Sequence, residues 1–144
     1  MPQVLYTAQA HVTGGRDQGH GSSTDGALEV DLRLPTEMGG KGGGTNPEQL
    51  FAVGYAACFE GAMAVVARRD KLDIDNAAVD SRVMLLPTEE RGFKLAVELD
   101  VTVPALDGEQ AAALVRSAHA VCPYSQATRG NIEVSLTANG QSVQ

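Results

Sequence analysis

Hydrophobic and polar residues alternate over residues 93–103, where every second side chain from Phe93 to Val103 is apolar. This period of two predicts a β-strand with one buried face. Residues 27–33 alternate in the same way, and residues 4–12, 78–86 and 132–138 are the other expected strands. Residues 87–92 are the expected turn between 78–86 and 93–103. The stretches 13–26, rich in glycine and serine, and 35–45, with five glycines, are expected loops.

A long apolar segment follows the second loop and predicts a helix. Asn46 is a favourable N-cap and Pro47 suits the first helical position, so the helix is expected to run from there to about Arg69. Between residues 50 and 67 its only charged side chain is Glu60. A helix that is apolar nearly all round has to be covered on all sides, which predicts a central core helix. Glu60 interrupts the run, so a membrane span is not favoured.

A second helix is expected from the N-cap Asp107 to about Val121, because Pro123 disfavours helical geometry at Cys122. The order is sheet, core helix, sheet, second helix and strand, which predicts an α+β fold. A length of 144 residues fits one domain, residues 1–144.

The net charge of the chain limits the classes of partner that we expect. The net charge of −7 argues against a nucleic-acid surface and disfavours anionic membranes. The first ten residues lack the basic start and apolar run of a signal peptide, so we expect a cytoplasmic protein. Thiols stay reduced there, so the two cysteines are buried bystanders, metal ligands or catalytic groups rather than a permanent disulfide.

Cys58 falls in the middle of the predicted core helix, one turn from Gly54 and Gly61, which leaves space beside its sulfur. One interpretation is a small buried hydrophobe. The other interpretation is a reactive thiolate. Burial would raise the pKa of the Cys58 thiol, and the helix N-terminus is too distant to stabilise the thiolate. A thiolate therefore needs a cation, and Arg16, which follows two glycines, is a candidate.

Cys122 stands beside Pro123 at a helix end, a position that suits a thiol which moves to meet a sulfenic acid. An inert core cysteine is the alternative, and a metal site from His119, Cys122 and Cys58 is a third interpretation. The glycines around Lys41 suggest a phosphate cradle, but Gly rather than Ser or Thr follows Lys41, so a flexible lid is preferred.

Two stretches carry a resemblance to a known family. GTNPEQLF at 44–51 leads into GYAACF at 54–59, and HAVCPYS at 119–125 is followed by ATRGNI at 127–132. Together with HVTGGRD at 11–17 they resemble the organic hydroperoxide resistance proteins, the Ohr branch of the Ohr/OsmC family. The likeness spans essentially the whole chain.

The resemblance implies a two-layer α+β fold with a central hydrophobic helix, in an intertwined homodimer with active sites at the subunit interface. It implies a peroxidase that reduces organic hydroperoxides to alcohols in defence against oxidative stress. Cys58 matches the peroxidatic cysteine, Cys122 the resolving one, Arg16 the activating arginine and Glu48 the glutamate that orients it. The electron donor would be a lipoyl-type dithiol, such as dihydrolipoamide or a lipoylated protein, and no metal or flavin cofactor is needed.

Two further hypotheses concern the site. Phe51, Tyr55 and Met63 could line an apolar substrate pocket, with core packing as the alternative. Glu48 precedes Cys58 by ten residues, about 15 Å along a helix, and points away from it. We therefore hypothesise that Glu48 acts on the Arg16 and Cys58 of the partner subunit. The rival functions are a non-enzymatic thiol redox sensor or small-ligand binding protein, and a structural dimer with inert thiols.

Overall fold

The computed structural model describes residues 2–144. The chain divides into two compact units, Met1–Leu50 and Phe51–Gln144, hereafter the N-terminal and C-terminal units. The single domain expected for residues 1–144 stays a prediction.

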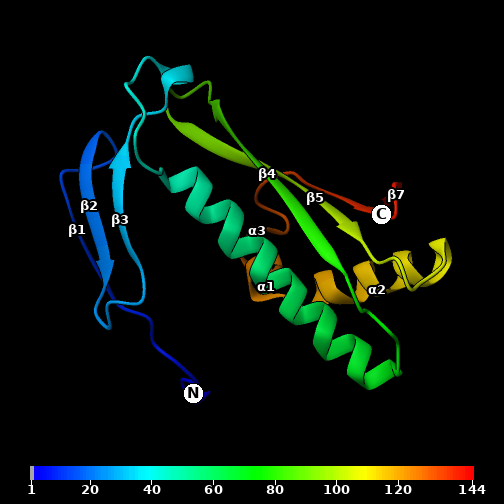
Figure 1. The fold of residues 1–144 in the computed structure, drawn as a ribbon. Helices are drawn as coiled ribbons and strands as arrows, with labels where there is room; N and C mark the ends of the chain where they lie inside the picture. Colours follow the sequence, from blue (N-terminus) through cyan, green and yellow to red (C-terminus); the bar gives the residue numbers. More distant parts are fainter. Residues whose placement is uncertain (1) are drawn as a thin grey trace. The chain divides into compact units, whose positions relative to one another are not determined.

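The N-terminal unit contains an antiparallel sheet in the order β1-β2-β3 (Figure 1). Its strands are β1 (Ala10–Thr13), β2 (Gln18–Ser23) and β3 (Glu29–Arg33), and the short 3-10 helix η1 (Thr36–Met38) follows. Strand β2 lies where a loop was predicted. Its inward positions are Gly19 and Gly21, and a Cβ on Gly19 would stand 1.9 Å from the carbonyl oxygen of Gly15. This strand therefore depends on glycines, which give no hydrophobic signal.

The first predicted strand is shorter than expected. Of residues 4–12 only those from Ala10 onward pair with a neighbouring strand. Val4, Leu5 and Tyr6 lie outside the strand and are largely exposed, at 73%, 97% and 79%. These apolar side chains are not covered by the described chain.

Helix α1 (Pro47–Asp70) begins as predicted, because the Asn46 side chain accepts a hydrogen bond of 2.8 Å from the backbone N–H of Gln49. It buries one side only, through Tyr55, Phe59, Ala62, Met63, Val66 and Ala67. On the other side Val53 is 70% and Val65 is 51% exposed. A helix covered on all sides was predicted, but the chain itself covers only one side of α1. By length and composition α1 could also cross a membrane, but a core helix passes the same test.

The C-terminal unit is built on a second sheet in the order β4-β5-β6-β7. The strands are β4 (Ala78–Pro87), β5 (Phe93–Thr102), β6 (Val134–Ala138) and β7 (Gln141–Val143). β4 and β5 form the predicted hairpin, whereas β6 lies parallel to β5. The crossover between β5 and β6 holds α2 (Gly108–Val121) and α3 (Pro123–Thr128). Asp107 forms the expected capping box with Gln110, and α2 ends where Pro123 predicts. α3 and β7 are elements that the sequence analysis did not predict.

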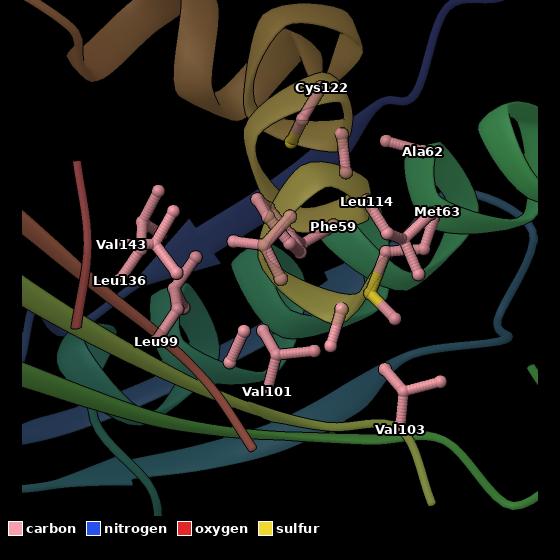
Figure 2. Packing of buried hydrophobic residues seen from close by; sticks show 14 of the residues in the cluster. Phe59, Ala62, Met63, Leu99, Val101, Val103, Leu114, Cys122, Leu136 and Val143 are labelled. Atoms are coloured by element: carbon pink, nitrogen blue, oxygen red, sulfur yellow. The ribbon is translucent and has the colours of Figure 1, made fainter. Parts of the chain in front are cut away.

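The core of this unit lies between the helices and one face of the second sheet (Figure 2). Alternate residues of β5, Val97, Leu99 and Val101, are at most 1% exposed, as the period of two predicts. They pack in one cluster with Phe59 and Met63 of α1 and with Leu114 and Val115 of α2. The mixture of helices and sheets confirms the α+β class and places both cysteines in or beside this core.

Candidate active site

The two cysteines lie next to each other in the C-terminal unit. Cys58 is half-buried on α1, and Cys122 is fully buried where α2 ends and α3 begins. The thiol of Cys122 donates a hydrogen bond to the Cys58 sulfur, with 3.5 Å between the two Sγ atoms. Both thiols are free. Since a disulfide needs the sulfurs at about 2.05 Å, a shift of roughly 1.5 Å would join them.

The surroundings of Cys58 in the C-terminal unit hold its pKa above the ordinary value. Burial raises the pKa most, the backbone N–H of Tyr124 opposes this by bonding to the sulfur, and Cys122 raises it further. None of these influences is a cation. Because the thiolate rather than the thiol is the nucleophile, these surroundings make Cys58 a weak nucleophile.

An ion pair lies in the N-terminal unit. The Arg16 guanidinium donates to the carboxylate of Glu48, the second residue of α1. Arg16 follows Gly14 and Gly15, whose φ angles of +82° and +67° lie in the left-handed region. A Cβ on Gly14 would stand 2.3 Å from the Gln18 carbonyl oxygen, so the turn that presents Arg16 requires glycine there.

The pairing corrects one sequence-based hypothesis. Glu48 was expected to act on Arg16 of the partner subunit, yet it bonds to Arg16 of its own chain. One carboxylate oxygen takes the bond, and the Nε of Arg16 is buried without a hydrogen-bond partner among residues 2–144. The guanidinium therefore keeps a free donor after pairing with Glu48.

A cleft of about 760 Å³ opens in the C-terminal unit. It is lined mostly by apolar side chains, with Lys94 as its charged member: Phe51, Phe93, Lys94, Leu95, Pro123, Tyr124, Ala127, Thr128, Asn131 and Ile132. Of the three predicted pocket residues, Phe51 lines this cleft. Tyr55 and Met63 have no exposed surface and belong to the core, because they fall on the buried side of α1.

Tyr124 joins the cleft to the thiols, and the sequence analysis did not single it out. Its ring lines the cleft and lies 5.8 Å from the Phe51 ring and 5.6 Å from the Tyr55 ring, while its N–H bonds to Cys58. The only available signal was its place two residues after Cys122.

A buried group of hydroxyls and one imidazole lies beside the cysteines. The Ser125 hydroxyl is 2.8 Å from the Tyr55 hydroxyl and 2.8 Å from Nδ1 of His119, and Thr128 Oγ1 is 3.1 Å from the Tyr55 hydroxyl. His119, considered above as a metal ligand, thus binds Ser125 with one ring nitrogen. Among residues 2–144 no group of three or more His, Cys, Asp or Glu side chains could hold a metal ion.

Known proteins resemble this chain over nearly all its length. Residues 40–137 match the family of OsmC-like proteins. The organic hydroperoxide resistance protein of Xanthomonas axonopodis pv. citri is 54% identical over 139 residues, which cover 94% of this chain and 95% of that protein. A crystal structure of an organic hydroperoxide resistance protein from Legionella pneumophila shares 51% of residues with a TM-score of 0.89, and covers 94% of this chain and 98% of that one.

A third relative carries a bound molecule. A crystal structure from Vibrio cholerae, assigned as an organic hydroperoxide resistance protein, has captopril in one of its active sites. It is 47% identical, has a TM-score of 0.93, and covers 98% of this chain and 96% of that one. These likenesses confirm the family that the two cysteine motifs indicated and its mixed helix and sheet fold. The chain belongs to the OsmC/Ohr family, among the organic hydroperoxide resistance proteins.

Proposed function

We propose that the protein is a thiol peroxidase that reduces organic hydroperoxides to alcohols and is recycled by a dithiol. The observation that carries the proposal is the 3.5 Å between the sulfurs of half-buried Cys58 and buried Cys122. The more accessible thiol, Cys58, can react with a substrate. The buried thiol, Cys122, lies close enough to react with the oxidised Cys58.

In the first step the Cys58 thiolate attacks the distal oxygen of ROOH. The O–O bond breaks, the alkoxide takes a proton and leaves as ROH, and Cys58 becomes a sulfenic acid. In the second step the Cys122 sulfur displaces the sulfenic hydroxyl, which leaves as water, and a disulfide joins the two cysteines. An external dithiol, such as dihydrolipoamide or a lipoylated protein, then reduces the disulfide in two exchanges and is itself oxidised to a disulfide.

The first step needs a positive charge that the C-terminal unit does not supply to Cys58. Arg16 fits this need, because a guanidinium stays charged at any biological pH and can stabilise both the thiolate and the leaving alkoxide. Glu48 would hold the guanidinium in place, while the unpartnered Nε remains able to donate.

Glu48 precedes Cys58 by ten residues, and it binds Arg16 of its own chain. A guanidinium held near the start of a helix is about 15 Å short of a residue ten positions along it. We therefore assign the Arg16–Glu48 pair of one chain to Cys58 of the partner subunit, which makes the homodimer part of the active site.

The exposed side of α1 supports a dimer. Val53 and Val65 lie on this side, and an added Cβ on Gly61 would meet no described atom within 4 Å. An apolar helix face with small residues allows another backbone to approach closely. A second copy of the chain would bury this face, as the apolar sequence of α1 predicts.

The cleft supports an organic rather than an inorganic hydroperoxide. Phe51, Phe93 and Tyr124 offer an apolar surface that favours alkyl chains over the small polar hydrogen peroxide. A relative that holds an organic molecule in one of its active sites is in keeping with such a site. We place the protein in the cytoplasm, where its thiols would stay reduced between turnovers.

Consumption of tert-butyl hydroperoxide with dihydrolipoamide tests the proposal. We expect steady turnover by the wild type and none by Cys58→Ser. Cys122→Ser is the matched control: without dithiol it should reduce about one equivalent of hydroperoxide per subunit and stop at the sulfenic acid, with no disulfide within the chain. Equal turnover in the wild type and Cys58→Ser would remove the proposal. Oxidation of the wild type by one equivalent without dithiol-driven turnover would instead support the sensor.

A further inference from the structure

The corner at which α2 ends and α3 begins carries Cys122, and specific bonds hold this corner. A group of hydrogen-bonded side chains connects this corner to α1. We call it the Ser125 cluster, and its members are Tyr55, His119, Ser125 and Thr128. Ser125 and Tyr55 have no exposed surface and Thr128 is 5% exposed. Tyr55 comes from α1, His119 from α2, and Ser125 and Thr128 from α3. The hydroxyl of Ser125 therefore joins all three helices through two bonds of 2.8 Å.

Three members of the cluster are close in sequence to the cysteines. Tyr55 precedes Cys58 by three residues and shares a face of α1 with it. Cys122 is the extended residue of the corner, with His119 three residues before it on α2 and Ser125 three residues after it on α3. A further bond of 2.9 Å, from the Arg129 guanidinium to the His119 carbonyl oxygen, ties α2 to the end of α3.

The hydrogen-bond directions in the cluster are mutually consistent. Burial, and then the charge of Arg129, lower the pKa of His119, which favours the neutral ring. A neutral Nδ1 can accept from the Ser125 hydroxyl, which in turn accepts from the Tyr55 hydroxyl. Loss of any one group takes a hydrogen bond from at least one other member of the cluster, and a buried polar group that loses a partner costs more than the net value of the bond. The cluster is therefore rigid and directional, unlike a contact between apolar side chains.

We propose that Ser125 and His119 are positioning residues for disulfide closure. They hold the corner against α1 so that the Cys122 sulfur meets the sulfenic acid of Cys58. In that step the S–S bond forms, the S–O bond of the sulfenic acid breaks, and water leaves with the proton of the Cys122 thiol. Because reaction rates depend steeply on misplacement of the order of 1 Å, loosening the corner slows closure while it leaves the attack on the hydroperoxide unchanged. The inference rests on the proposed function.

Two variants of His119 and one of Ser125 test this role. His119→Leu and Ser125→Ala remove bonds of the cluster. His119→Asn is the matched control, because the Asn amide can place a hydrogen-bonding atom near the position of Nδ1. Since His119 is only half-buried, its variants remain informative if Ser125→Ala fails to fold.

The first measurement follows a single oxidation by tert-butyl hydroperoxide in the presence of dimedone, which traps sulfenic acid before it closes. Mass spectrometry then gives the ratio of dimedone adduct to disulfide. We expect this ratio to rise about tenfold in His119→Leu and Ser125→Ala and less than about twofold in His119→Asn, with an unchanged rate of hydroperoxide consumption in all three. An unchanged ratio in both disruptive variants overturns the inference, as does an equal rise in His119→Asn and His119→Leu.

A second measurement uses no hydroperoxide. The equilibrium between the thiols and the Cys58–Cys122 disulfide in dithiothreitol buffers reports how well the two sulfurs are placed. We expect the disulfide to be about tenfold less favoured in His119→Leu than in His119→Asn. If the wild type forms no sulfenic acid, the proposed peroxidase fails, and this equilibrium still decides the role of the cluster. Equal equilibria in the two His119 variants overturn it.

Discussion

Oxidation of the two thiols should stabilise the fold, and the size of the effect can be worked out from the structure. Closing the disulfide would join α1 to the crossover that follows β5, and the cysteines are separated by 64 positions in the chain. Such a loop restricts the unfolded chain far more than the folded one. The perturbation needs no substitution, because the same protein can be prepared with free thiols or with the disulfide.

The chain-entropy relation for a loop of this length gives about 4 kcal/mol at 25 °C. Strain in the native state would reduce this gain, but the sulfurs already lie 3.5 Å apart, so only a small movement is needed. At about 3 °C per kcal/mol for a chain of this size, the Tm of the oxidised form should rise by roughly 12 °C. By the same thermodynamic cycle, folding favours the disulfide about 1000-fold over its formation in the unfolded chain.

Urea unfolding of the reduced and oxidised forms measures the gain directly. Both are compared at one protein concentration, because the proposed dimer would make apparent stability depend on concentration. Cys122→Ser is the control and should unfold at the same urea concentration before and after oxidant. A gain below about 1 kcal/mol, or a loss, would refute the reasoning, because it would mean that closure distorts the native helices.

Other predictions concern charge and assembly. Arg16→Met should lower kcat/KM at pH 7 by about 100-fold and Arg16→Lys by about tenfold, because Lys keeps the charge but not the paired donors. The pH profile of Cys58 alkylation should move to higher pH in Arg16→Met, and coincident profiles would contradict the proposed role of the guanidinium. Val65→Asp should convert the proposed dimer to monomers in light scattering, since it places a charge on the exposed side of α1; a dimer that survives the substitution would exclude this face. His20 bonds to Asp31 at 2.9 Å and to Glu29 at 3.0 Å, and chiefly the Asp31 bond raises its pKa above 6.5. The stability that His20 contributes is therefore complete below pH 6.5 and lost as pH rises through the raised value, a dependence that NMR of the ring can follow and that His20→Gln should abolish.

The fold could be predicted wherever burial leaves a periodic trace. Residues 93–103 alternate because one face of β5 meets the core, and α1 begins at Asn46 because a side-chain oxygen caps its first turn. Strand β2 leaves no such trace, since its inward positions are glycines that allow a close approach of backbone. The parallel pairing of β6 with β5 depends on contacts far apart in sequence, which no local pattern encodes.

Some features of the candidate site could likewise be predicted from the sequence, and others could not. The Cys58–Cys122 pair could be anticipated from two motifs, but not from their spacing, because it arises where two helices meet. Helical periodicity indicated that Tyr55 and Met63 share the helix with Phe51, yet it did not show which side faces the core. Ser125 was not singled out because a lone hydroxyl in a polar motif has no periodicity, and its partners come from two other elements.

The parallel placement of β6 has a consequence for synthesis. During translation the ribosome releases α1 first and the crossover that carries Cys122 much later. The crossover can dock only after β6, at Val134–Ala138, has left the exit tunnel and entered the sheet beside β5. Until β6 has paired with β5, the segment that carries Cys122 is not held against α1, and the two thiols stay apart. The contact between the two sulfurs is therefore among the last features of the fold to form.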